Sequence, residues 1–328
     1  MEKIKVFKFT NANGISVEYL NYGATIYKIN VPDKNGNLIN VVVSLNKPED
    51  YFSDAYISKG LYLGTMVGRY AGRISNGGFE IDEKRYNLYN VDGVHLHGGP
   101  KGLDKKYWEV EEICEDQNKI TFSCFSEHLE EGYPGDLTVK ITYQLTDENE
   151  LHISYSAKCN KTTHLNLTNH SYFNLNGKGS ILEHDLHINS DRRLEVDSLT
   201  VPSGKFLDNK NSRFDYLKTT KLGKPGFEII DDAFEINKNK EVAATLYSKE
   251  TGILMEVKTN QPAVVVFTHP EFPELPLPEN VKYKAYPSIC FECQNFPDAP
   301  NKIHFPSTLL NPGEEYINIT TYKFKTVK

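Results

Sequence analysis

Hydrophobic and polar residues alternate with a period of two along much of this chain. The alternation is clear in residues 3–9, 15–19, 25–31 and 38–43. Because successive side chains of a β-strand point to opposite faces, each of these segments is expected to form a strand. The last two are joined through the turn-forming residues 32–36, PDKNG. The N-terminal region is therefore predicted to consist of short antiparallel strands.

The same pattern recurs further along the chain, as pairs of alternating segments around short polar turns. Residues 79–82 and 85–88 form one such pair, and residues 138–145 and 151–155 form another. Alternating segments joined by a short polar turn are typical of β-hairpins. Both pairs are therefore expected to be hairpins of an antiparallel sheet.

Helical periodicity is scarce, since no segment keeps an i, i+3, i+4 pattern over three turns. Short helices are expected only after residues 46–48 and near Leu182. With 16 prolines, 22 glycines and 12% aromatic residues, the pattern predicts an all-β fold, a large antiparallel sandwich or barrel. Such folds often exceed the usual domain length and no linker interrupts the chain, so residues 1–328 are expected to form a single domain.

Composition and charge exclude several classes of partner. The net charge is −7, and no run of lysine or arginine resembles a nucleic-acid footprint. The longest apolar run, residues 263–267, is far shorter than the roughly 20 residues that span a bilayer, and the N-terminus lacks the apolar stretch of a signal peptide. We expect a cytoplasmic protein without nucleic-acid or membrane partners, whose five cysteines are reduced thiols.

The most informative segment is residues 166–177. Treated as a strand, it places His170 on one face with Asn166, Thr168 and Tyr172. A strand made only for packing would carry apolar residues at every second position, whereas this face is polar. It also contains the side chain best suited to proton transfer near neutral pH. The segment therefore predicts a functional surface.

A second polar segment, residues 94–99, contains His95 and His97, which would share one face of a strand. Two imidazoles could bind a transition metal, but such a site normally needs a third ligand, and none is evident in the sequence. We therefore expect no metal site. A histidine that hydrogen-bonds a substrate oxygen is the favoured interpretation, and a purely structural histidine is the alternative.

A third polar segment, residues 288–298, contains Glu292 within an otherwise apolar strand. A buried carboxylate is costly unless it is paired or used, which makes Glu292 a candidate functional residue. Cys290 and Cys293 are expected to point to opposite faces of this strand, so that neither a disulfide nor a shared metal ion is predicted.

Arginine is rare, yet two of the six arginines, Arg69 and Arg73, lie in residues 64–74. A planar guanidinium can bind two neighbouring oxygens, so either could hold a sugar, or each could form a structural salt bridge. Asp231 is a further candidate for binding hydroxyl groups. The chain has no phosphate-binding or dinucleotide-binding glycine motif and no nucleophile elbow.

Taken together, these segments resemble the galactose mutarotase (aldose 1-epimerase) family. The resemblance extends over nearly the whole chain, from NYGA at 21–24 to LNPGEEY at 310–316. The motifs that agree in order are GRYAGRI (68–74), LHGG (96–99) followed by Trp108, EGYPG (131–135), NLTNHSYFNL (166–175), DDAF (231–234) and FECQNFPD (291–298).

The resemblance implies a β-supersandwich with an open sugar cleft that interconverts the α and β anomers of aldohexoses such as galactose and glucose. It implies that Glu292 is the general base for the C1 hydroxyl and that His170 is the acid for the ring oxygen. The two are expected on opposite sides of the anomeric carbon, with the pyranose between them. His97 would bind oxygens around that carbon, and Arg73 and Asp231 would bind the remaining hydroxyls.

The resemblance further implies that neither a cofactor nor a metal is needed, and a monomer or homodimer is expected. The chain departs from common family patterns at Gly72, where Asn is frequent, at Val265, where Gln is frequent, and at Asp232, where His is frequent. These departures leave the preferred sugar open.

Three other functions remain as alternatives. A hexose-6-phosphate epimerase of the same fold should gather basic side chains around the phosphate, and no such cluster is visible in the sequence. A glycoside hydrolase would need two carboxylic acids, for which Glu292 and Asp231 are available, but His170 would then have no role. A non-catalytic carbohydrate-binding protein would tolerate the loss of Glu292 and His170.

Overall fold

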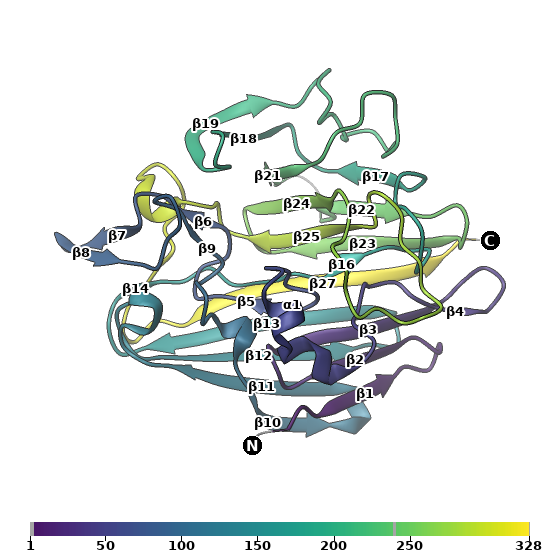
Figure 1. The fold of residues 1–328 in the computed structure, drawn as a ribbon, viewed down its shortest axis with the longest axis horizontal. Coiled ribbons are helices and arrows are strands. Elements are labelled where there is room, and N and C mark those ends of the chain that lie inside the picture. The colour runs from purple at the N-terminus through teal and green to yellow at the C-terminus, as the bar shows by residue number, and fades with distance from the viewer. Residues whose placement is uncertain (1–2, 239–240, 328) are drawn as a thin grey trace.

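Antiparallel sheets account for most of the protein. The computed structural model describes residues 3–238 and 241–327. Its largest sheet has nine strands in the order β10-β11-β12-β13-β27-β23-β22-β17-β20 (Figure 1). The bounds of these strands are β10 Glu109–Cys114, β11 Lys119–Ser126, β12 Leu137–Leu145, β13 Glu150–Cys159, β27 Tyr316–Thr326, β23 Ile253–Thr259, β22 Ala244–Tyr247, β17 Asp185–Ile188 and β20 Thr220–Lys221.

A second sheet has six strands in the order β16-β25-β24-β21-β18-β19. These strands are β16 Tyr172–Phe173, β25 Ser288–Gln294, β24 Ala263–His269, β21 Asp231–Glu235, β18 Arg192–Val196 and β19 Pro202–Asp208. A third sheet is formed by β1 Val6–Thr10, β2 Ser16–Leu20, β3 Thr25–Pro32 and β4 Leu38–Asn40, paired in sequence order. The predicted all-β fold is therefore confirmed.

Short strand pairs complete the structure. They are β14 Thr163–His164 with β26 Leu309–Leu310, β15 Thr168–Asn169 with β5 Met66–Val67, β6 Arg73–Ile74 with β9 His95–Leu96, and β7 Gly78–Ile81 with β8 Lys84–Asn87. The predicted hairpins at 79–88 and 138–155 correspond to β7–β8 and β12–β13.

Helices are few and short among the described residues. They are the α-helix α1 Asp54–Ile57 and the 3₁₀-helices η1 Pro48–Phe52, η2 Leu103–Lys105, η3 Glu115–Gln117, η4 Glu130–Gly132 and η5 Ala299–Asn301. The helix expected after residues 46–48 is present as η1 and α1. The helix expected near Leu182 is wrong, because residues 181–184 form a turn whose Leu182 carbonyl accepts a hydrogen bond from Gly223 N–H. In the described residues, no helix is long and apolar enough to cross a membrane.

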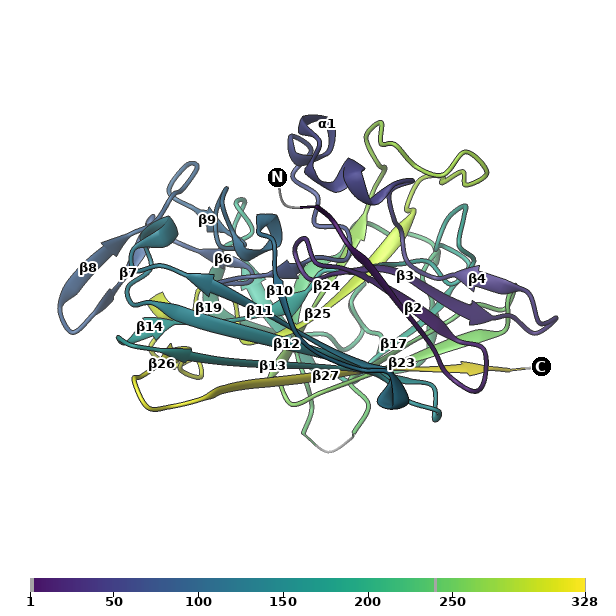
Figure 2. The same ribbon diagram turned by 90° about the horizontal axis from the view of Figure 1, so that it is seen from below.

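The main hydrophobic core lies between the nine-stranded and six-stranded sheets. In Figure 2 the long strands β12, β13 and β27 lie along one side of the molecule, with β24 and β25 above them. Phe173 of β16 packs against Tyr322 of β27 with ring centroids 4.9 Å apart, and the Tyr322 hydroxyl donates to the Phe291 carbonyl. These contacts fix the two sheets to each other.

Strand β25 is covered on both faces. Ile289, Phe291 and Cys293 belong to the core between the sheets, whereas Cys290 packs in a second cluster on the other face. Glu292 shares the face of Cys290 because the two are separated by two positions. The prediction that Cys290 and Cys293 point to opposite faces is confirmed, and both are free thiols.

Candidate active site

Strand register brings His170 and Glu292 together. Tyr172 of β16 pairs with Cys290 of β25, so continuing this antiparallel register by two residues places His170 opposite Glu292. The His170 Nε2 atom lies 3.4 Å from Glu292 Oε1, and both side chains are only 4% exposed. Two residues 122 positions apart in sequence therefore meet in one buried pair.

This geometry corrects the expectation that a pyranose lies between the two side chains. A contact of 3.4 Å leaves no room for a sugar ring between His170 and Glu292. Instead, the two groups lie side by side on one wall of the pocket. They can still address two different oxygens of the sugar, because O1 and O5 are both bonded to C1 and are therefore close neighbours.

Residues 166–177 do not form one continuous strand as expected. The segment is divided into β15 and β16, and His170 lies between them. The reason is backbone pairing with a different segment: His170 N–H donates to the Thr65 carbonyl, and Gly64 N–H donates to the His170 carbonyl. Residues 166–176 are buried on both faces, and of this segment His170 and Tyr172 line the pocket.

His97 presents a defined tautomer to the pocket. The Gly72 backbone N–H donates to His97 Nδ1 over 3.2 Å, which makes Nδ1 an acceptor. Burial lowers the pKa of His97 well below its usual value, and the nearby His170 and Arg73 act in the same direction. The neutral ring therefore carries its proton on Nε2 and offers an N–H donor.

His95 does not share this site, which corrects the expectation that the two histidines face the same way. His97 has a φ of +50°, and this left-handed conformation interrupts the alternation of the strand. His95 is held by the Tyr89 carbonyl at Nδ1 and by the Tyr133 hydroxyl at Nε2. His95 is thus the structural histidine of the pair.

The two candidate arginines also have different roles. Arg73 contacts Asp231 with its Nη2 atom 3.5 Å from Oδ2, and both line the pocket of His170 and Glu292. Arg69 is buried and donates to Ser126 and to four backbone carbonyls. Asp232 points away from the pocket and pairs with Arg193. The structure therefore brings Arg73 and Asp231 to the site, whereas Arg69 and Asp232 lie outside it.

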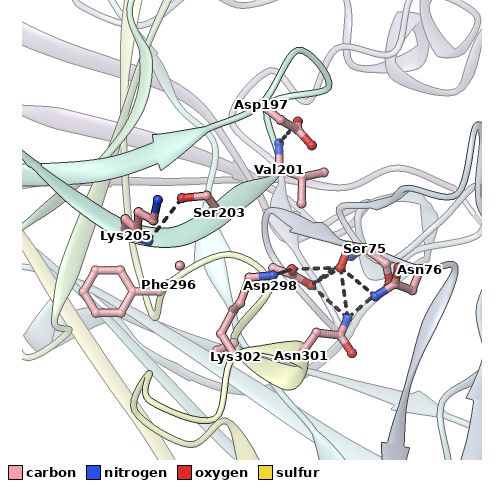
Figure 3. Close-up of polar contacts among 12 residues, drawn as sticks. Ser75, Asn76, Asp197, Val201, Ser203, Lys205, Phe296, Asp298, Asn301 and Lys302 are labelled. Atoms are coloured by element: carbon pink, nitrogen blue, oxygen red, sulfur yellow. Dashed lines mark hydrogen bonds and ion pairs between the residues drawn. The ribbon is translucent and has the colours of Figure 1, made fainter.

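A network of polar contacts fixes the backbone of Arg73. Asp298 donates its N–H to the Arg73 carbonyl over 2.7 Å. Its fully buried carboxylate accepts from the Ser75 N–H and hydroxyl, from the Asn301 amide and from the Lys302 ammonium (Figure 3). Strand β6, which carries Arg73, is thus tied to the loop that follows β25.

Aromatic residues complete the pocket, and two of them, Tyr62 and Phe267, were not singled out from the sequence. The Tyr62 ring lies 4.8 Å from the His97 ring and 5.6 Å from the His170 ring, measured between centroids. Phe267 of β24 and Tyr172 of β16, on either side of β25, pack around His170. Tyr62 lies two residues before the glycine and arginine motif at 64–74, but no alternation marks it, so only the fold shows its position.

Burial shifts the two candidate catalytic groups in opposite directions. It raises the pKa of Glu292 to about 8, with a further rise from the Asp231 carboxylate and a partial offset from Arg73. It lowers the pKa of His170 to about 4. Burial also raises the pKa of Asp231, and Arg73 opposes this shift. Between pH 4 and 8 the His170–Glu292 pair therefore holds one proton.

Three side chains in the pocket have the composition of a metal-ligand set. Ligand atoms of His97, His170 and Glu292 lie within 4.8 Å of one another. However, a metal on His97 Nε2 would force the ring proton onto Nδ1, where it would face the Gly72 N–H. Two donors cannot share a hydrogen bond. The tautomer of His97 thus favours a role as hydrogen-bond donor, and His95, the other histidine considered as a metal ligand, is not part of this set.

The β-sandwich holds a buried carboxyl group and a buried imidazole in one polar pocket of about 210 Å³. These are the features of a general acid–base enzyme that acts on a small polar substrate. A family model for aldose 1-epimerase matches residues 5–323. The galactose mutarotase of Bos taurus is 38% identical over 321 residues, covering 94% of this chain and 91% of that protein. The chain belongs to the aldose 1-epimerase family.

Solved structures agree with this assignment. A homologue of aldose epimerase from C. elegans superposes with a TM-score of 0.92 at 30% identity, covering 99% of this chain and 100% of that one. The galactose 1-epimerase of Lactobacillus acidophilus NCFM gives a TM-score of 0.87 at 30% identity, with coverage of 100% and 96%. The predicted family and the galactose mutarotase-like fold are both confirmed.

Proposed function

We propose that this protein is an aldose 1-epimerase that interconverts the α and β anomers of aldohexoses such as galactose and glucose. The observation that carries the proposal is the buried contact of 3.4 Å between His170 Nε2 and Glu292 Oε1. General acid–base assistance of ring opening requires one group that accepts a proton and one that donates it, both next to C1. This pair supplies both groups on one wall of the pocket.

The pKa shifts place the single proton of the pair mainly on Glu292 in the free protein. The reactive form is the other one-proton form, in which the proton resides on His170 and Glu292 is ionised. Glu292 removes the proton of the C1 hydroxyl, the C1–O5 bond breaks, and His170 protonates O5. The products of this step are the open-chain aldehyde, neutral His170 and protonated Glu292. After rotation about the C1–C2 bond, the O5 hydroxyl returns its proton to His170, O5 attacks C1, and Glu292 protonates the new O1. The pair ends in its starting state, so that no other reactant is consumed.

The remaining pocket residues hold the sugar during the rotation. His97 Nε2–H donates to an oxygen near C1, because Gly72 fixes its tautomer. Arg73 and Asp231 offer donors and acceptors to hydroxyls further along the ring. If the rest of the ring is held, only the C1 end is free to turn.

Asp231 also helps to distinguish an aldohexose from a hexose-6-phosphate as the substrate. A hexose-6-phosphate would place its phosphate among cations, but Arg73 is already paired with the Asp231 carboxylate in this pocket. A like charge beside the phosphate would weaken its binding. The pocket therefore supports a neutral aldohexose.

We further propose that the protein acts in the cytoplasm as a monomer or homodimer. The free state of all five cysteines supports a reducing compartment.

Polarimetry of freshly dissolved α-galactose and α-glucose tests the proposed function. The optical rotation is expected to reach its equilibrium value faster with the protein than in buffer alone. A parallel assay with an aryl galactoside should release no phenol, since mutarotation breaks no bond to an aglycone. Equal decay of rotation with and without protein, or release of the phenol, would refute the proposal.

A further inference from the structure

A second cavity, hereafter called the annex, adjoins the sugar pocket. Its volume is about 450 Å³, roughly twice that of the sugar pocket. Gly60, Tyr62, Arg73 and Leu96 line both cavities, whereas His170 and Glu292 line only the sugar pocket. The annex therefore adjoins the part of the sugar pocket that is shared with Arg73 and Tyr62.

Large hydrophobic side chains with considerable exposure converge on the annex. Tyr89, Val91, Leu96 and Leu199 all line it, and each is between 37% and 60% exposed. They come from three segments: the loop after β8, the strand β9, and the turn between β18 and β19. Exposed apolar side chains are common when they are scattered, but a cluster beside an active site indicates a binding surface.

The turn that carries Leu199 is well ordered by its own hydrogen bonds. The Asp197 carboxylate accepts from the backbone N–H groups of Leu199 and Val201, at 2.8 and 3.0 Å. The Asp197 N–H also donates to the Val201 carbonyl, which closes the turn. Figure 3 shows the contact between the Asp197 carboxylate and the Val201 N–H. Leu199 is thus held in position rather than placed by chance on a loose loop.

The orientation of the sugar follows from the proposed function, on which this inference rests. O1 and O5 must lie at Glu292 and His170, so that the C1–O5 edge of the pyranose faces that wall. The opposite edge of a pyranose is the C3–C4 bond. A substituent on O3 or O4 therefore points away from Glu292 and His170, toward the hydroxyl-binding end of the pocket, where Arg73 lines both the sugar pocket and the annex.

We propose that the annex is a subsite for an apolar substituent on O3 or O4 of a reducing hexose. Its lining includes Val91, Leu96 and Leu199 besides two tyrosines, and Arg73, Asp92 and Lys105 are its charged members. The apolar part of this surface gains from burying an aromatic or alkyl group. The enzyme thus epimerises aldohexoses that carry a hydrophobic ether or ester group, with the substituent bound outside the sugar pocket.

The test compares 3-O-benzyl and 4-O-benzyl galactose with the corresponding methyl ethers and with galactose itself. Mutarotation is followed by proton NMR of the anomeric signals. At least one benzyl ether is expected to show a KM about tenfold lower than its methyl analogue, given the apolar area that the ring buries. Calorimetry with Glu292→Gln should show the same preference without turnover.

Leu199→Asp should abolish the advantage of the benzyl ether and leave the kinetics of galactose unchanged. Leu207→Asp is the matched control, since Leu207 is an exposed leucine of the same hairpin and does not line the annex. The proposal is overturned if galactose is epimerised and neither benzyl ether binds more tightly than its methyl ether. It is also overturned if Leu199→Asp changes only the oligomeric state in sedimentation, because the annex would then be a subunit contact. Absence of turnover with galactose would instead refute the proposed function.

Discussion

At the scale of single residues, the proposed function makes activity depend on the protonation of the pair His170 and Glu292. In this proposal the pair must hold one proton, which His170 uses as the acid, while Glu292 is the base. Below a pH of about 4 both groups are protonated, so the base is lost. Above a pH of about 8 the pair loses its last proton, so the acid is lost. We therefore predict a bell-shaped profile of kcat/KM against pH, with limbs near these two values. Polarimetry over a range from about pH 3.5 to about pH 9.5 would measure this profile.

A second prediction concerns the alkaline limb of that profile. The Asp231 carboxylate contributes to the raised pKa of Glu292. Removing this charge in Asp231→Asn should lower the pKa of Glu292, and the alkaline limb should move to lower pH. Asp232→Asn is the control, because Asp232 faces Arg193 outside the pocket. An alkaline limb that stays in place in Asp231→Asn would show that the limb does not report on Glu292.

Some residues of this site could be predicted from the sequence and others could not, for reasons that differ between residues. Glu292 and His170 stand out as polar exceptions within strands, because burial of such groups needs a purpose. The tautomer of His97 could not be predicted, because it depends on a backbone N–H from Gly72, 25 positions away. Tyr62 was missed because an aromatic residue in a loop has no pattern that separates pocket lining from ordinary packing.

At the scale of elements, the loop after β9 sets the position of His97. Gly98 has a φ of +83°, and a Cβ atom there would lie 1.9 Å from the Gly68 carbonyl oxygen. Gly98→Ala should therefore displace the loop, lower the activity and reduce the free energy of unfolding. Gly93 has a similar φ of +80° but open space around it, so Gly93→Ala should show only the cost of the left-handed conformation, about 1–2 kcal/mol.

Denaturant unfolding and polarimetry of the two variants separate these effects. If Gly98→Ala matched Gly93→Ala in both stability and activity, close packing of this loop would not control the site.

The prediction of one long strand over residues 166–177 was wrong, and the reason also lies in how elements pair. The partner of the His170 backbone, residues 64–65, lies about a hundred positions earlier, and a period of two contains no information on such pairing.

At the scale of the whole molecule, the site depends on the packing of two sheets. Phe173 is fully buried between Phe291 and Tyr322, three residues beyond His170 in sequence. Phe173→Ala should reduce the free energy of unfolding by about 3–5 kcal/mol through the cavity that it leaves. Phe125→Ala, at a position 54% exposed on β11, should cost much less. Equal losses in denaturant unfolding would contradict the layered core.

The all-β architecture could be predicted because many strands have one buried face, as in β12, where Leu137, Val139 and Ile141 are buried and the residues between them are less so. The order of strands could not, because β27 at the C-terminus lies between β13 and β23. Pairing of such distant segments is decided by the fit of whole faces rather than by any local pattern.

The most direct test of the account is the mutarotation rate of α-galactose with Glu292→Gln, a variant that keeps the shape of the side chain and removes the base. We predict that the rate constant per enzyme falls by about 10²- to 10⁴-fold relative to the unaltered protein, while circular dichroism and unfolding stay close to those of the unaltered protein. Glu183→Gln, at an exposed glutamate, should retain full activity. A correctly folded Glu292→Gln protein that accelerates mutarotation as well as the Glu183→Gln protein would contradict the central claim.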